Sequence, residues 1–375
     1  MIYLDNSATT IPEKAVADEI YNMLTANFGN PSSFHKAGLD ANAKLRKARQ
    51  SVANLLGCES EEICFTSGGT EANNLAILGA AAALGRRGKR IVTTAIEHES
   101  VLQTVDELEK QGFEVIRLMP DKEGNISKAQ IAEAVNADTI LVTMMYVNNE
   151  VGTVLPVEFI KKAVQKAGAP ALVHIDCVQA FGKIPVRPSK LGADLVSVTA
   201  HKIHGAKGVG ALYVKKGARI LPRQFGGEQE KKLRPGTEAI PLIAGFGKAC
   251  ELCSLDSIAQ HMAQINAYAR QKLLEIEGVT LNSPDSASDY IINFYVPVFM
   301  TSQTVVQHLS SKYGICISNG SACAKGKKSH VLTAMKLPDK TIERSVRVSF
   351  SRHTTQEDID ALVTAIKETV ENYHI

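Results

Sequence analysis

A lysine beside a glycine-rich turn is the first residue of this chain whose type and setting could do chemistry. Lys202 lies in DLVSVTAHKIHGAKGVGALYV, just after an apolar stretch at 194–198 that is expected to be a strand. A partly desolvated lysine at a strand end has a lowered pKa and can form a Schiff base with an aldehyde cofactor. Thr199, His201 and the nearby glycines could bind a phosphate. A surface lysine in an ordinary turn is the alternative interpretation.

A second glycine turn also has the character of a phosphate site. In EICFTSGGTEANNLAI, an expected strand runs into Ser67-Gly68-Gly69-Thr70, and a helical pattern follows. Small residues at such a turn let backbone N–H groups and the helix N-terminus contact a phosphate. The sequence has neither the P-loop lysine spacing nor the G-x-G-x-x-G pattern, which argues against a nucleotide. Such turns are common, so this segment alone decides nothing.

Polar side chains follow three other apolar runs. Asp176 closes the run ALVHI at 171–175, where a carboxylate needs a cationic partner such as a protonated pyridine nitrogen, unless it simply caps a helix. Gln179 could donate to a phenolic oxygen. His98 in TTAIEHESV could stack on a flat ring and move protons near neutral pH, or it could be a capping residue. Asn149 in MMYVNNEVG offers an amide donor.

The elements that would position these residues alternate between strands and helices. The expected strands are 62–66, 90–94, 114–118, 139–145, 171–175, 194–198 and 210–214. This alternation predicts an α/β fold with a mainly parallel seven-stranded sheet covered by helices on both faces. Ligands bind such sheets at the carboxyl ends of the strands. His98, Asn149, Asp176 and Lys202 are therefore expected to converge.

The pattern changes after about residue 250. A long helix at 257–276 precedes separate strands around 290–296 and 345–350, and a last helix is expected at 355–371. This succession is typical of a smaller α+β domain.

Composition excludes several classes of function. The 375 residues are 45% hydrophobic and 22% charged, and a net charge of +3 does not indicate a nucleic acid or a membrane as partner. No apolar run is long enough to span a membrane, and the N-terminus lacks a signal-peptide pattern, so a cytoplasmic location is expected.

Seven scattered cysteines predict free thiols. Cys250 and Cys253 form a C-x-x-C within a helical pattern, without a second pair, so no metal site is predicted.

One cysteine has a distinctive setting. Cys323 lies in SNGSACAKGKKSH, which is expected to be an exposed loop at about 319–331. Lys325, Lys327 and Lys328 could lower the pKa of the thiol and so increase its reactivity. The alternative is a loop cysteine without a task, beside a solvated basic surface.

Taken together, motifs along nearly the whole chain resemble the class V aminotransferase group of pyridoxal-5'-phosphate (PLP) enzymes and, within it, the NifS/IscS-type cysteine desulfurases. The most specific part is AHKIHGAKG followed downstream by SNGSAC. The other motifs are YLDNSATT, FGNPSSFH, TSGGTEANN, EHESV, NNEVGT, HIDCVQAFGK, LRPGTE and VRVSFSRHTT.

The resemblance implies a role for each candidate residue. Lys202 would bind PLP covalently, Asp176 would pair with the pyridine nitrogen, His98 would stack on the ring, and Gln179 would contact the phenolic oxygen. The implied phosphate ligands are Gly69, Thr70, Thr199, His201 and, from the neighbouring subunit, Thr237. The implied ligands of the substrate carboxylate are Asn149 and Arg347.

The family also implies an architecture and a reaction. The architecture is a homodimer of the PLP-dependent transferase fold type I, with a large domain at 15–250 and a small domain formed by 1–14 and 251–375. The reaction converts L-cysteine to L-alanine and leaves a persulfide on Cys323, with His98 moving a proton at the substrate thiol. A selenocysteine lyase, another class V aminotransferase, and a silent binding protein are the competing interpretations.

The sulfur acceptor is left open by the sequence. An iron–sulfur scaffold, a thio-cofactor pathway and a tRNA-thiolating enzyme all remain candidates for the protein partner. The stretch after Cys323 is shorter than in the IscS type, Asn319 stands where serine is usual, and the chain ends at Ile375 without the longer docking tail of that type. These departures affect the expected partner and leave the expected chemistry unchanged.

Overall fold

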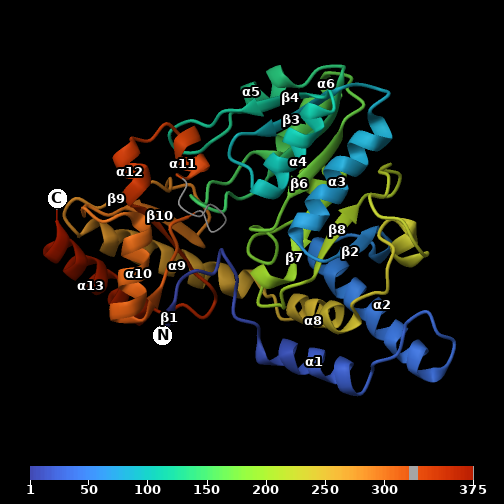
Figure 1. Ribbon diagram of the computed structural model, residues 1–375, viewed down its shortest axis with the longest axis horizontal. Helices are drawn as coiled ribbons and strands as arrows, with labels where there is room; N and C mark the ends of the chain where they lie inside the picture. Colours follow the sequence, from blue (N-terminus) through green and yellow to red (C-terminus); the bar gives the residue numbers. More distant parts are fainter. Residues whose placement is uncertain (321–327, 375) are drawn as a thin grey trace.

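A seven-stranded sheet forms the centre of the larger part of the molecule (Figure 1). The computed structural model describes residues 1–320 and 328–374, so Cys323 lies outside the described residues. In spatial order the strands are β2 (Ile63–Thr66), β8 (Gly210–Val214), β7 (Leu195–Thr199), β6 (Leu172–Asp176), β5 (Thr139–Met145), β3 (Arg90–Thr94) and β4 (Glu114–Leu118). Only β8 runs antiparallel to its neighbours, which confirms the predicted mainly parallel sheet.

Burial on both faces of the sheet explains why the sequences of these strands are continuous apolar stretches. Every residue of β5 and of β7 is buried, as expected for strands with helices on both faces. Helix α3 (Gly69–Leu84) packs on β5, β6, β7 and β8, and it also packs on α4 (Glu99–Lys110). The remaining helices of this part are α1 (Lys14–Thr25), α2 (Lys36–Leu56), α5 (Lys128–Ala134), α6 (Ile160–Lys166), α7 (Pro188–Leu191) and α8 (Ile240–Glu251).

Two small sheets lie beside the large one. Antiparallel strands β12 (Ser345–Ser349), β10 (Ile291–Tyr295) and β9 (Thr280–Leu281) form one, and parallel β1 (Ile2–Tyr3) and β11 (Ile315–Cys316) form the other. The β1–β11 pairing brings the beginning of the chain against its last third. Figure 1 shows both termini on this side. The helices here are α9 (Leu255–Leu274), α10 (Ser302–Tyr313), α11 (His330–Ala334), α12 (Asp339–Arg344) and α13 (Gln356–Tyr373).

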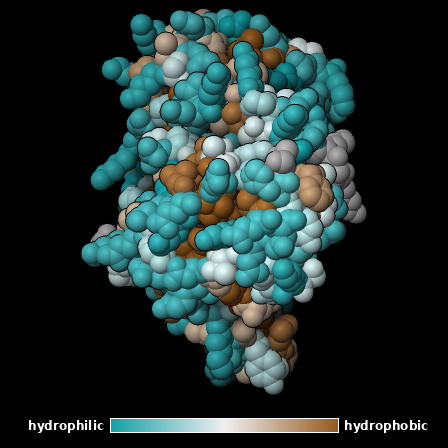
Figure 2. All heavy atoms as spheres, turned by 90° about the vertical axis from the view of Figure 1, so that its left-hand side faces the viewer, coloured by the Kyte–Doolittle hydropathy of each residue, from teal (hydrophilic) through white to brown (hydrophobic). Residues whose placement is uncertain are grey.

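The surface of this side is mainly hydrophilic, with a cluster of apolar residues near its middle (Figure 2). Leu274 and Phe299 are exposed apolar side chains of the small-sheet part. Among the described residues, no helix combines the length and the apolar character that a membrane crossing needs.

Candidate active site

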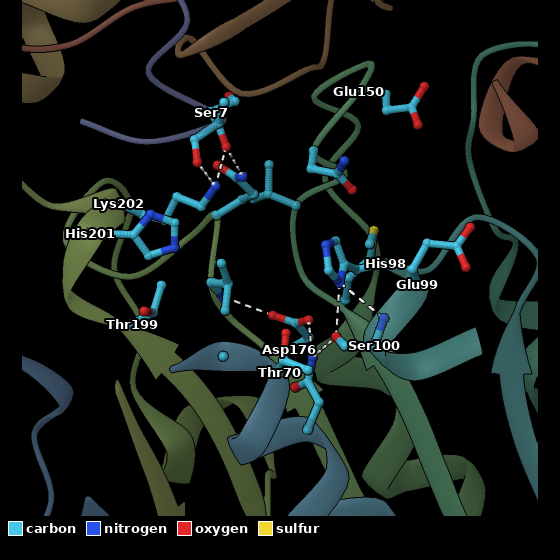
Figure 3. A pocket seen from close by; sticks show the side chains of 18 of the residues that line it. Ser7, Thr70, His98, Glu99, Ser100, Glu150, Asp176, Thr199, His201 and Lys202 are labelled. Carbon is cyan, nitrogen blue, oxygen red and sulfur yellow. Dashed lines mark hydrogen bonds between the residues drawn. The ribbon is translucent and has the colours of Figure 1, made fainter. Parts of the chain in front are cut away.

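A cavity of about 310 Å³ lies at the carboxyl ends of β5, β6 and β7, where α3 and α4 begin. Figure 3 shows Lys202, His98 and Asp176 pointing into it from different elements. The structure brings ten of the predicted residues to this cavity, namely Gly69, Thr70, His98, Asn149, Asp176, Gln179, Thr199, His201, Lys202 and Arg347. Its size suits a small cofactor together with a small substrate.

Lys202 ends a short 3-10 helix (Ala200–Lys202) that follows β7 directly. Its Nζ donates to the backbone carbonyl of Ser7 and to that of Ala8, the latter at 2.7 Å. Burial, with the charges of Lys183 and Arg347 as smaller causes, lowers the pKa of Lys202 to about 7. A large share of this amine is therefore neutral at physiological pH, which is the nucleophilic form.

Asp176 is the last residue of β6, and only 5% of it is exposed. Its Oδ1 accepts from the backbone N–H of Val178 at 2.9 Å, and its Oδ2 accepts from Asn73 Nδ2 at 2.8 Å. Both donors are neutral groups. The carboxylate is thus held rigidly and can still take a cationic partner, which a buried charge requires.

His98 both caps α4 and lines the cavity, so its capping contact does not remove it from the site. Its Nδ1 accepts from the backbone N–H of Ser100 at 3.1 Å and lies 2.8 Å from Ser100 Oγ. Because Nδ1 accepts, Nε2 carries the proton in the neutral ring. Burial lowers the pKa of His98, with Lys202 acting in the same direction and Asp176 against it, so a neutral ring is favoured.

The end of the cavity nearest α3 suits a phosphate. Gly69 and Thr70 open this 16-residue helix, whose first N–H groups lack partners within the helix. A Cβ at Gly69 would lie 2.7 Å from Val178 Cγ2, so the close approach of the two segments requires glycine. Thr199 Oγ1 donates to the carbonyl of Val209, and burial lowers the pKa of His201 to about 3, which makes its ring a neutral donor or acceptor.

Arg347 lies in the middle of β12 and enters the cavity from the small-sheet side. Only 2% of it is exposed. Its Nη2 bonds Asp5 Oδ1 at 2.8 Å, and its Nη1 donates to the carbonyls of Asn149 at 2.8 Å and Gly320 at 3.2 Å. These contacts fix the guanidinium in a position from which it can meet an anionic group.

Several residues around the cavity escaped the sequence reasoning. Asn73 donates to both Asp176 and Ser100 Oγ and so joins α3, β6 and α4. Glu97 is fully buried, and burial raises its pKa to about 8 although Thr94 and the Met145 N–H donate to it. In the sequence, the one signal that could have identified Asn73 is its position one turn into the helix that begins at Gly69.

Lys183 is a second buried amine near Lys202. Its Nζ donates to Gln179 Oε1 at 3.0 Å, and Gln179 Nε2 donates to the Ser7 carbonyl that Lys202 also contacts. Burial, then the charge of Arg347, lowers the pKa of Lys183 to about 7. The two amines therefore share one hydrogen-bonded group, and the cation at Lys183 disfavours protonation of Lys202.

Replacing Lys183 by methionine should raise the pKa of Lys202, because a neighbouring cation that disfavours protonation is removed. The measurement is acylation of Lys202 in the apoprotein at a series of pH values, followed by mass spectrometry. The midpoint of the labelling curve, near pH 7 in the unsubstituted protein, should shift upward. Lys190→Met, at an exposed lysine, is the matched control and should leave it in place. An unchanged midpoint in Lys183→Met would show that the charge of Lys183 does not contribute to the lowered pKa of Lys202.

Comparison with known proteins places these features in a family. The profile described as "Aminotransferase class-V" matches residues 2–362. A protein named "Cysteine desulfurase IscS" from Dictyoglomus turgidum is 39% identical over 99% of this chain and 94% of its own length. The chain belongs to the cysteine desulfurases of the class V aminotransferase family.

Other cysteine desulfurases and solved structures agree with this assignment. "Putative cysteine desulfurase IscS 1" from Bacillus subtilis is 38% identical over 98% of both chains. A structure titled "NIFS-LIKE PROTEIN" superposes with a TM-score of 0.93 at 36% identity, covering 99% of each chain. Another, titled "SspA in complex with cysteine", gives 0.82 at 34% identity, covering 95% of this chain and all of that one. The predicted family, enzyme class and fold are confirmed.

The cavity of this cysteine desulfurase fits the cofactor on which the family depends. PLP carries an aldehyde, a pyridine nitrogen and a phosphate. The cavity offers a partly neutral amine at Lys202, a buried carboxylate at Asp176 and a free helix N-terminus at Gly69. These three groups come from different elements and line one cavity.

Two predicted site residues do not line this cavity among the described residues. Thr237 is exposed, in the segment that precedes α8, so its predicted role depends on a second subunit. Cys323 falls in the segment 321–327, outside the described residues. Both roles stay predictions.

Proposed function

We propose that this chain converts L-cysteine to L-alanine with PLP bound at Lys202, and that Cys323 receives the sulfur as a persulfide. The observation that carries the proposal is the shared cavity of Lys202, Asp176 and His98. This cavity contains an amine of lowered pKa at Lys202, a buried carboxylate at Asp176 and, at His98, an imidazole for which the neutral form is favoured. The cysteine desulfurase relatives support this choice over an aminotransferase or a selenocysteine lyase.

Bound PLP would supply an electron-withdrawing ring that stabilises negative charge next to the substrate nitrogen. Lys202 would remove the proton from the substrate Cα, because a neutral amine of pKa near 7 suits general base catalysis at neutral pH. Asp176 would keep the pyridine nitrogen protonated, and Gln179 would contact the phenolic oxygen. His98 would exchange a proton with the substrate thiol through Nε2.

Binding of the substrate and of the phosphate would occur at opposite ends of the cavity. Arg347 and the Asn149 amide would bind the substrate carboxylate. The N–H groups of Gly69 and Thr70, together with Thr199 and His201, would bind the phosphate. In a homodimer, Thr237 of the second copy would complete the phosphate site.

The sulfur step conserves atoms and electrons. The Cys323 thiolate attacks the substrate sulfur, an S–S bond forms and the substrate C–S bond breaks. The electron pair of the broken bond stays on the departing carbon, which takes a proton and becomes the methyl group of alanine. Cys323 is left as a persulfide.

The wider setting of the reaction belongs to the same proposal. The persulfide would pass to a protein acceptor in iron–sulfur cluster assembly, a thio-cofactor pathway or tRNA thiolation, within the cytoplasm. The large domain would comprise 15–250, and the small domain would comprise 1–14 and 251–375 with the loop at about 319–331. The name IscS among the relatives supports iron–sulfur assembly as the first acceptor to test.

Borohydride reduction of the holoprotein should fix a pyridoxyl group on Lys202, which peptide mass spectrometry identifies. Incubation with L-cysteine should then yield alanine and a persulfide on Cys323 in the untreated enzyme. Cys323→Ser should abolish the persulfide and sulfide release, whereas Cys58→Ser, at a half-buried thiol on another segment, should not.

Two of the rival interpretations predict different results. An aminotransferase retains full turnover in Cys323→Ser, and a silent binding protein shows no absorbance change when cysteine is added. A pyridoxyl group fixed on any residue other than Lys202 contradicts the proposed site.

A further inference from the structure

Three possible metal ligands from distant parts of the chain meet outside the cavity described above. Glu13 immediately precedes α1, His204 lies two residues after Lys202, and His353 follows β12. One ligand atom from each lies within 4.8 Å of the other two. None of the three lines the 310 Å³ cavity described above, although His204 and Lys202 both line a smaller cavity beside it. The proposed desulfurase reaction therefore leaves this cluster without a task.

His204 is oriented as histidine ligands of metals are. Only 7% of it is exposed, and its Nδ1 lies 2.9 Å from the carbonyl oxygen of Ile11. A carbonyl can only accept, so Nδ1 carries the proton and Nε2 keeps its lone pair. Metal-bound histidines commonly donate their other ring N–H to a backbone carbonyl in this way.

The backbone at His204 is also constrained. Its φ is +64°, which non-glycine residues seldom adopt, and its N–H donates to Thr10 Oγ1 at 2.7 Å. Strained backbone persists where surrounding contacts determine it, and it concentrates at functional sites. The turn after Lys202 is thereby fixed with the imidazole directed at Glu13 and His353.

Glu13 and His353 complete the set from the surface side. His353 Nε2 lies 2.6 Å from Glu13 Oε1, and its ring meets that of His204 edge to face, with centroids 5.1 Å apart. Arg352 donates to the same Oε1 through Nε and Nη2, at 3.2 and 2.8 Å. Arg352 thus holds the carboxylate through Oε1, and the hydrogen bonds of the described residues leave Oε2 available. The side chain of His353 is 60% exposed, which gives an ion access.

We propose that Glu13, His204 and His353 bind a divalent transition metal ion of the Zn²⁺ type. Two imidazole nitrogens and one carboxylate oxygen suit Zn²⁺, Co²⁺ and Ni²⁺, and leave a position for water. The ion would displace the proton shared by His353 and Glu13. It would tie the turn after Lys202 to the segment that follows β12, and so join the large sheet to the small-sheet part.

Titration of the metal-free holoprotein with Co²⁺ tests the proposal, in the Cys323→Ser background so that the loop thiol cannot bind the ion. One ion per chain should bind, with visible ligand-field absorption and no thiolate charge-transfer band. Zn²⁺ should displace it and raise the thermal midpoint. His353→Phe should weaken Co²⁺ binding by at least about tenfold, as loss of a group at a metal site does.

His374→Phe is the matched control, since it removes another exposed histidine and should leave Co²⁺ affinity unchanged. His353→Asp, which restores an oxygen ligand, should recover part of the affinity. The proposal is overturned if no stoichiometric ion binds, if His353→Phe binds as tightly as the control, or if a thiolate band shows that cysteines hold the ion.

Discussion

Replacing Lys202 by alanine should lower alanine formation from L-cysteine by roughly 10²- to 10⁴-fold, the range that one general acid–base group contributes. The substitution removes the one lysine amine of residues 1–320 and 328–374 that lines the cavity at the end of β7. The next buried amine, Lys183, is bonded to Gln179 and does not line that cavity. Single-turnover measurements with labelled cysteine give the rate directly.

The folded state should tolerate this change. Burial disfavours the protonated form of Lys202, as its pKa of about 7 shows, so removing the amine also removes a cost of folding. Against this stand the two bonds to the carbonyls of Ser7 and Ala8. We therefore expect a thermal midpoint close to that of the unsubstituted protein.

Two comparisons make the Lys202 result specific. Lys207→Ala removes an exposed lysine from the same turn and should keep full turnover. A small primary amine added to Lys202→Ala should restore part of the rate, because it can replace the missing base. If Lys202→Ala keeps full turnover, Lys202 is not the base.

The geometry of parallel strands explains why much of the site could be predicted. His98, Asn149 and Lys202 follow β3, β5 and β7, Asp176 ends β6, and these four strands are neighbours in the sheet. Carboxyl ends of adjacent parallel strands lie at one edge, so residues far apart in sequence meet there. The alternation of strands and helices was therefore enough to predict this convergence.

Backbone groups and buried partners could not be predicted in this way. The Ser7 and Ala8 carbonyls hold Lys202, which is more than 190 positions away, and a carbonyl has no side-chain signature. Their placement depends on the β1–β11 pairing and on the bond from the Ser7 N–H to Ser349 Oγ in β12. Arg347 came only from the family resemblance, because a buried arginine inside an apolar strand has no local pattern to mark it.

Glu150 illustrates a partner that only the fold reveals. It is 1% exposed, and its carboxylate accepts from Ser329 Oγ while a Cβ at Gly320 would lie 3.1 Å from its Oε2. Gly320 and Ser329 border the segment that carries Cys323. Burial raises the pKa of Glu150, although Ser329 and nearby cations oppose this. In the sequence Glu150 simply follows two asparagines, and no local pattern indicates that it is buried.

Replacing Asp176 by asparagine should lower turnover by roughly 10²- to 4 × 10³-fold while the protein still folds. The change removes a buried negative charge that would pair with a protonated ring nitrogen, and loss of one partner of a buried pair costs about 3–5 kcal/mol. Each 1.4 kcal/mol is a factor of about ten. Steady-state alanine formation at saturating PLP measures the loss, and the cofactor absorption spectrum should change with it.

The hydrogen bonds around Asp176 limit the structural damage. Asparagine can still accept from the Val178 N–H, but its amide nitrogen then faces Asn73 Nδ2, a second donor. Rotation of the Asn73 amide relieves this clash, since its buried Oδ1 has no partner among the described residues. The rotation turns both Asn73 N–H groups away from their acceptors at position 176 and at Ser100 Oγ, at a cost of about 1–3 kcal/mol for each buried N–H left without an acceptor. A fall in the thermal midpoint should follow.

Asp194→Asn separates this structural cost from the catalytic one. Asp194 is also 5% exposed and also accepts a backbone N–H, that of Val173, but it lies outside the cavity and pairs with Lys161. Its substitution should lower the thermal midpoint without lowering turnover. Asp176→Asn could instead behave like Asp194→Asn, with a lower thermal midpoint and unchanged turnover. In that case the carboxylate at 176 is a structural hydrogen-bond acceptor, and another residue must pair with the ring nitrogen.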